Sequence, residues 1–197
     1  VGSQSKGSGY EGDGLVRFTF DSASRATGNV GRIRGLKAWL AEAVPELQGT
    51  ANRIGDEVLN IEALAWDPVG GRLLLGLRAP VVNEQALIVP IKFSGPFTRE
   101  NLRIDGSTIR LNLGGAGLRG MEYDAHTKSF RLIAGAPLNA ESRDFQILEW
   151  DGQPGSTPRA TGSHSRRLKP EGITRVYLDG RPAIVIVFDT GAFAVTQ

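Results

Sequence analysis

Ile61-Glu62-Ala63-Leu64-Ala65-Trp66-Asp67 returns 57 positions later as Leu118-Arg119-Gly120-Met121-Glu122-Tyr123-Asp124. At the same spacing, Ala79-Pro80 returns as Ala136-Pro137, and a third copy opens at Pro170-Glu171-Gly172-Ile173. Self-similarity at a fixed period is typical of repeat architectures, in which each unit packs on its neighbours. The sequence therefore predicts three related modules, and this repeat determines the expected fold.

Within each module the apolar residues follow the period of β-strands. Thr108–Leu113 alternates apolar and polar residues, as a half-buried strand does, and Ala86–Ile91 is a short apolar run. The first module thus contains four expected strands, the second repeats the series and the third contains three. The expected strands are 61–66, 72–77, 86–91, 108–113, 118–123, 129–134, 145–150, 159–162, 171–177, 183–188 and 193–196.

Four strands in about 50 residues match a blade of a β-propeller. Tandem β-sandwiches are the rival, but they need nearer 100 residues per domain. Leu15–Asp21 is similar to Phe145–Trp150, so the chain is expected to begin inside a blade. We predict a single all-β domain over residues 1–197, a partial β-propeller-like array of about three to three and a half four-stranded blades. Closed rings have about 4 to 8 blades, so a further chain segment or a homo-oligomer is expected to complete the ring.

One segment departs from the strand pattern. Between Val30 and Val44, apolar residues recur at helical spacing at Ile33, Leu36 and Leu40, and Pro45 follows directly. The pattern predicts an inserted helix near residues 30–44, packed on the rim of the array.

Composition narrows the classes of function. The net charge of +2 is small, and acidic and basic residues are interspersed. The densest basic cluster consists of Arg166, Arg167 and Lys169. It is too short to form the basic stripe that nucleic-acid binding needs. The absence of cysteine excludes disulfides and cysteine-bearing zinc sites and fits either redox compartment. No apolar run approaches the roughly 18 residues of a membrane span. Two histidines far apart exclude a histidine-rich metal centre, whereas calcium on oxygen ligands stays compatible.

The candidate site follows from the repeat. Glu62, Arg119 and Glu171 occupy the same position at the start of the innermost strand, so they are expected to converge at the mouth of the central channel. Such charges either tie neighbouring blades together as ion pairs or grip a polar ligand. Arg78, in a connection that opens on the same face, and His164, in the connection before Glu171, are expected to share that surface.

Asp67 and Asp124 end the innermost strands and begin turns. An aspartate at the start of a turn bonds its own backbone, so we expect both to be structural.

No motif assigns a catalytic residue. The sequence has no G-x-S-x-G elbow, phosphate loop, H-E-x-x-H or EF-hand spacing. The leading hypothesis is therefore a module that binds a small polar ligand or a protein partner at the channel mouth. The alternatives are a purely structural repeat and a hydrolase of phosphoesters or carboxylic esters. In such a hydrolase Arg78 and Arg119 would hold the anion, Glu62 and Glu171 would hold a metal or act as base, and His164 would carry protons.

A resemblance supports this architecture. Asn60–Trp66, Leu73–Pro80 and Ala86–Val89 together resemble the hallmark of a bacterial family, the domain of unknown function 3616. Gly117–Tyr123 and Pro170–Thr174 are similar to the next two segments of that family.

The resemblance runs from Val1 to about Phe188 and implies a β-propeller whose first blade lies outside this sequence. Ser3-Gln4-Ser5 resembles a Ser-His-Ser strand end of the family, with Gln4 in place of the histidine, and Ala63 replaces a usual glycine. The resemblance implies no activity. Propellers with similar leading Glu-Gly segments include phytase-like and esterase-like proteins, which is an analogy of fold alone.

Overall fold

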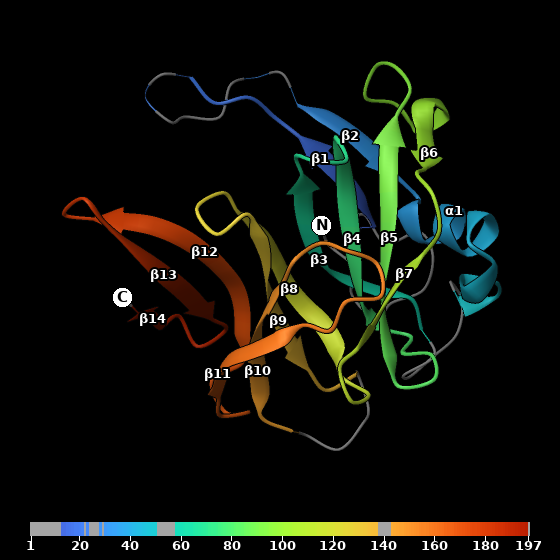
Figure 1. The fold of residues 1–197 in the computed structure, drawn as a ribbon. Coiled ribbons are helices and arrows are strands. Elements are labelled where there is room, and N and C mark those ends of the chain that lie inside the picture. The colour runs from blue at the N-terminus through green and yellow to red at the C-terminus, as the bar shows by residue number, and fades with distance from the viewer. Residues whose placement is uncertain are drawn as a thin grey trace.

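The chain forms a partial β-propeller. The structure, a computed structural model, describes residues 13–21, 23, 28, 30–50, 58–137 and 143–196; Ser3-Gln4-Ser5 lies outside this part. The described residues form four antiparallel sheets and one α-helix, as the repeat predicted. Successive sheets lie side by side, and their innermost strands are neighbours, with β8 (Gly117–Asp124) between β3 (Asn60–Asp67) and β12 (Pro170–Leu178) (Figure 1).

Each module folds as one sheet, and a two-stranded ribbon precedes the first. The ribbon pairs β1 (Gly14–Arg17) with β2 (Gly31–Arg34). The first sheet contains β3, β4 (Arg72–Ala79), β5 (Gln85–Phe93), β6 (Leu102–Ile104) and β7 (Ile109–Asn112). The second sheet has the order β8, β9 (Ser129–Gly135), β10 (Phe145–Trp150), β11 (Arg159–His164), and the third β12, β13 (Arg181–Phe188), β14 (Phe193–Thr196). Short 3₁₀ helices cover Pro45–Leu47 and Arg99–Asn101.

The outer strand of the first sheet differs from the expectation of a single strand at 108–113. β6 pairs with the end of β5, and β7 pairs with its beginning, so two short strands share one edge. Between them, the Asp105 N–H donates to the Pro90 carbonyl, and Arg72 Nη1 lies 3.4 Å from Asp105 Oδ2. The interruption is therefore fixed by contacts from neighbouring strands.

The expected helix at 30–44 is shorter than its pattern suggested. Residues 31–34 form strand β2, and helix α1 covers only Leu36–Ala43. Gly35, at φ +70°, separates the two elements in a left-handed conformation that glycine adopts without strain. Ile33 is buried, but as a residue of strand β2 and not of the helix. A single apolar residue fits both the helical and the strand period, so the pattern did not distinguish them.

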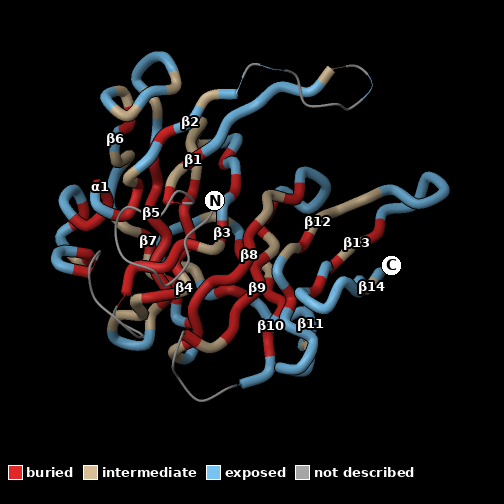
Figure 2. Tube along the Cα trace, turned by 180° about the vertical axis from the view of Figure 1, so that it is seen from behind, coloured by how far each residue is buried: buried red, intermediate tan, exposed pale blue. Residues whose placement is uncertain are grey.

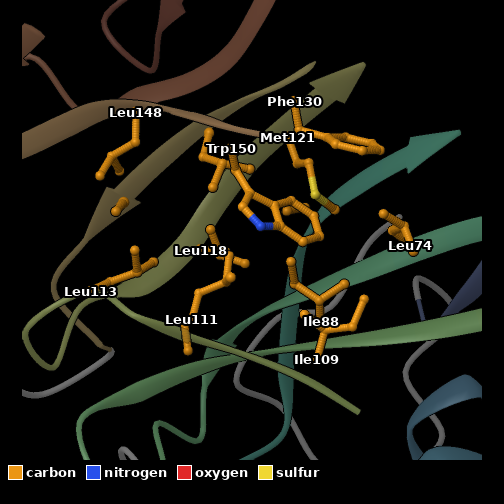
Figure 3. Packing of buried hydrophobic residues seen from close by; sticks show 14 of the residues in the cluster. Leu74, Ile88, Ile109, Leu111, Leu113, Leu118, Met121, Phe130, Leu148 and Trp150 are labelled. Atoms are coloured by element: carbon orange, nitrogen blue, oxygen red, sulfur yellow. The ribbon is translucent and has the colours of Figure 1, made fainter. Parts of the chain in front are cut away.

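The core lies between the sheets. β4 reads as a continuous apolar run because the first sheet is buried on both faces. Leu74 packs toward the second sheet, in the cluster around Trp150 shown in Figure 3, whereas Leu75 packs toward the ribbon and α1. Burial is densest in the first two sheets and thins toward the third (Figure 2). None of the described helices has the length and apolar character needed to cross a membrane.

Gly117 allows two sheets to approach closely. A Cβ at this position of β8 would lie 2.0 Å from the Arg78 carbonyl oxygen of β4. We expect Gly117→Ala to lower the free energy of unfolding by about 1–3 kcal/mol, because the backbone must shift to relieve the overlap. Gly162→Ala is the matched control, since its Cβ would meet only Ile147 at 3.9 Å. Urea denaturation of both variants measures the difference; equal stability of the two would contradict the close approach.

Candidate functional site

A β-bulge recurs at one position in all three modules. The pairing register shifts between Ile61 and Ala63, between Leu118 and Gly120, and between Pro170 and Gly172. The skipped residues are the three charged ones that the repeat singled out, Glu62, Arg119 and Glu171. A bulge leaves one residue out of the ladder and re-aims its side chain. The charged residues therefore owe their direction to a backbone irregularity that the fold repeats.

The bulges bring the charges together. Arg119 Nη2 donates to Glu171 Oε1, and Arg119 Nε lies 3.6 Å from Glu62 Oε2. Arg78 Nη1 donates to Glu62 Oε1 at 2.9 Å. The order Arg78, Glu62, Arg119, Glu171 alternates in charge and runs from the first sheet to the third. Four of the five candidate residues thus form one ion-pair network.

This network fixes the central guanidinium. Arg119 is 7% exposed, and its guanidinium lies 5.3 Å from the centroid of the Phe145 ring. Further contacts hold its neighbours: Asn60 Nδ2 donates to Glu62 Oε1, and Arg78 Nε donates to the Ala136 carbonyl. The pair of Arg119 with Glu62 crosses from the second sheet to the first, and its pair with Glu171 crosses to the third.

A cleft opens beside the network, between the second and third sheets. We call it the basic cleft; its volume is about 370 Å³. Its charged lining consists of five cations and two carboxylates. These residues are Arg78, Arg119, Arg143, Arg166, Lys169, Glu171 and Asp189. The repeat predicted one surface for Arg78, Arg119 and Glu171. The densest basic cluster of the sequence supplies Arg166 and Lys169 to the same cleft, although the repeat did not assign them to it, and Arg143 lies in a connection without a periodic signal.

The structure does not bring His164 to this cleft. Its ring packs edge-on against Phe188, with the centroids 5.4 Å apart. It lines a separate cavity between the second and third sheets, together with Ile173 and Arg175. His164 ends β11 opposite Phe145; Phe145 lines the basic cleft, whereas His164 lines the separate cavity. The expected proton carrier is therefore placed apart from the four converging charges.

A second charged cluster surrounds Asp124, at the opposite end of β8. The Oδ1 atom of Asp124 accepts the His126 N–H, and Asp67 accepts the N–H groups of Val69 and Gly70, which confirms that both aspartates stabilise turns. Asp124 also accepts hydrogen bonds from two arginines, Arg131 of its own sheet and Arg175 of the third sheet. It is 2% exposed, so this cluster joins the second and third sheets as a buried ion-pair group.

Glu122 lies beside this cluster, and the pKa values of Glu122 and Asp124 are shifted in opposite directions. Burial alone would raise the pKa of Asp124, but the hydrogen bonds from Arg175 and the His126 N–H hold it far below its usual range. Burial raises the pKa of Glu122, although its hydrogen bond with Thr174 Oγ1 opposes that shift. The cluster therefore keeps Asp124 ionised and disfavours a second negative charge beside it.

Among the described residues, no group of three or more acidic or histidine side chains is arranged to hold a metal ion. Comparison of the chain with protein-family models, with curated proteins and with solved structures gives no match.

Proposed function

We propose that this protein is a binding module that takes up a small anion in the basic cleft. The observation that carries the proposal is the excess of cations, five against two carboxylates, around about 370 Å³. An excess of one sign of charge around a cleft raises the local concentration of ligands of the opposite sign. Phosphate and carboxylate groups are the anions that arginine recognises best, because its planar fork matches two oxygens at once.

Two groups of residues would contact the anion: fixed arginines on the floor of the cleft and exposed residues at its rim. Arg119 and Arg78 are held by carboxylates and a carbonyl, so they present their remaining N–H groups in fixed directions. Arg143 and Lys169 lie at the exposed rim, where Arg143 donates to the Gly114 carbonyl and Lys169 lies 3.7 Å from Asp189. The fixed side chains of the floor lower the cost of ordering on binding, because they are already held in place.

The rim offers the sharper test, because removing buried Arg119 would also disturb the sheet-to-sheet network. We expect the wild-type chain to bind inorganic phosphate or pyrophosphate in calorimetric titrations at constant ionic strength. The double variant Arg143→Gln, Lys169→Gln should bind about tenfold or more weakly, since two charge-assisted contacts are lost. The melting temperature should stay close to that of the wild type.

Arg159→Gln is the matched control. Arg159 is 73% exposed and pairs with Glu149 outside the cleft, so its loss changes the net charge without touching the proposed site. Arg159→Gln removes one positive charge and the double variant removes two. Weakening by the control of half the double variant's change in binding free energy, or more, would therefore show general attraction to a basic protein. No measurable heat with either anion would reject the proposal.

The same preparation discriminates binding from catalysis. Incubation with 4-nitrophenyl phosphate and 4-nitrophenyl acetate, with and without Ca²⁺, should give no turnover above buffer under the binding proposal. Turnover that the double rim variant loses would favour the hydrolase hypothesis instead. The resemblance to the bacterial family assigns no activity, so the proposal depends on the cleft alone.

A further inference from the structure

A second surface of the molecule is apolar and lies at the other end of the array. An apolar groove of about 420 Å³ runs between β1 and the first sheet, with Leu64, Trp66 and Phe93 among its lining residues. Leu64 is 37% exposed and Trp66 is 54% exposed, and both belong to the innermost strand β3. Apolar side chains gathered in one groove indicate an interaction surface.

The repeat shows what normally covers these two positions. Their equivalents 57 residues later are Met121 and Tyr123. Met121 is buried, and Tyr123 packs on the same cluster, which includes residues of the inner strand pair β3–β4 of the preceding sheet. By the same geometry, Leu64 and Trp66 are suited to packing on the inner strand pair of a sheet that precedes the first.

The β1–β2 ribbon lies before the first sheet, and its outer edge can form hydrogen bonds with an added strand pair. Among the described residues, β1 pairs with β2 on one side and with no other strand. The Gly35 N–H donates to the Asp13 carbonyl at 3.0 Å, which makes Asp13 and Gly35 a hydrogen-bonded pair. Hydrogen-bonded pairs alternate along an antiparallel ladder, so the N–H and C=O groups of Val16 point away from β2, to the outer edge.

We propose that a different polypeptide supplies an antiparallel strand pair that adds to the outer edge of β1 and covers Leu64 and Trp66. A second copy of the chain is not suited to this role, because its own β3–β4 pair is buried on both faces of its first sheet. The pair would be of the β3–β4 type, in which small apolar residues such as Ala63 and Ala65 face the neighbouring sheet. Strand addition gives affinity through the main chain, and the apolar groove selects the side chains.

A peptide with the sequence of residues 60–79, carrying Trp66→Phe so that it does not emit, is the probe. Of the three tryptophans in the protein, Trp39 and Trp150 are buried and Trp66 is the exposed one. Saturable binding of the peptide should shift the tryptophan emission of the full chain to shorter wavelength. A peptide of the same composition in scrambled order should produce no shift.

Val16→Pro tests the hydrogen-bonded edge. Proline removes the outward N–H of Val16 but leaves the bonds of Leu15 and Arg17 to β2, so it is tolerated at such an edge. We expect it to weaken peptide binding about tenfold or more, whereas Val16→Thr, which keeps the N–H, should bind like the wild type. Melting temperatures of both variants monitor the fold.

Three results would overturn the proposal. The first is no emission shift with the ordered peptide. The second is binding that Val16→Pro leaves intact, which would show adhesion to the groove without strand addition. The third is self-association of the chain that already buries Trp66 without peptide, which would make a second copy the occupant.

Discussion

Trp150→Ala is expected to lower the free energy of unfolding by about 3–5 kcal/mol, the range for removing a large aromatic side chain from a core. Trp150 is 1% exposed and sits in the cluster that joins the first and second sheets (Figure 3). Its ring lies 5.2 Å from that of Phe130, and its Nε1 donates to the Gln153 carbonyl. The measurement is urea denaturation followed by far-UV circular dichroism.

Trp66→Ala is the control, because it makes the same substitution at an exposed position. Trp66 is 54% exposed, so its removal should cost well under 1 kcal/mol, the usual range for surface substitutions. Comparable destabilisation by the two variants would contradict the position of the core between the sheets.

Asp124→Asn should lower the free energy of unfolding by about 3 kcal/mol at neutral pH. The amide keeps the turn acceptor for the His126 N–H but leaves Arg131 and Arg175 without their shared negative charge. Asp67→Asn is the matched control at the equivalent position. Its acid bonds one arginine, Arg72, and the expected loss is about 1 kcal/mol.

The pH dependence of this effect has a definite sign. The pKa of Asp124 is depressed in the folded chain. Its contribution to the free energy of unfolding is therefore complete above the pKa of the unfolded chain, about 4. The stabilisation declines as the pH falls below that value toward the folded pKa. The difference between wild type and Asp124→Asn should therefore be constant from about pH 5 to 7 and shrink below about pH 4. A difference that grew on acidification would contradict the buried ion-pair group.

Several features of the fold follow from local patterns in the sequence. The 57-residue spacing placed the strands of the first two sheets apart from β6, and strand periodicity located β14 at residues 193–196 as observed. The convergence of Glu62, Arg119 and Glu171 followed from their equivalent positions. Local patterns suffice for these features because strands with alternating or continuous apolar residues must bury them against a neighbour.

The expected helix at 30–44 and the expected single strand at 108–113 differ from the structure in short segments. Ile33 fits both a helical stripe and a strand, and Gly35 decided between them through a conformation that depends on its neighbours in space. At the split of the outer strand into β6 and β7, Asp105 pairs with Arg72, which is distant in the sequence. Neither feature has a periodic signal.

The bulges have a signal that the sequence did contain. In each module a small residue follows the charged one: Ala63 after Glu62, Gly120 after Arg119, and Gly172 after Glu171. A Cβ at Gly120 or Gly172 would lie 3.0 Å from a branched side chain of the next strand. Small residues beside a skipped position are typical of bulges, so the pattern could have predicted them.

By itself, the sequence determined that three copies of one module fold into neighbouring sheets and that their leading charges meet, because repeated apolar patterns impose repeated packing. The small residue after each charge marks the bulge in the sequence, but the tertiary structure decided which partner each charge meets, because the partners lie on other sheets. The tertiary structure also gathered Arg143 and Lys169 from separate connections into the basic cleft and turned His164 away from it. Residues in connections are placed by the strands that precede and follow them, and no local periodicity records that placement.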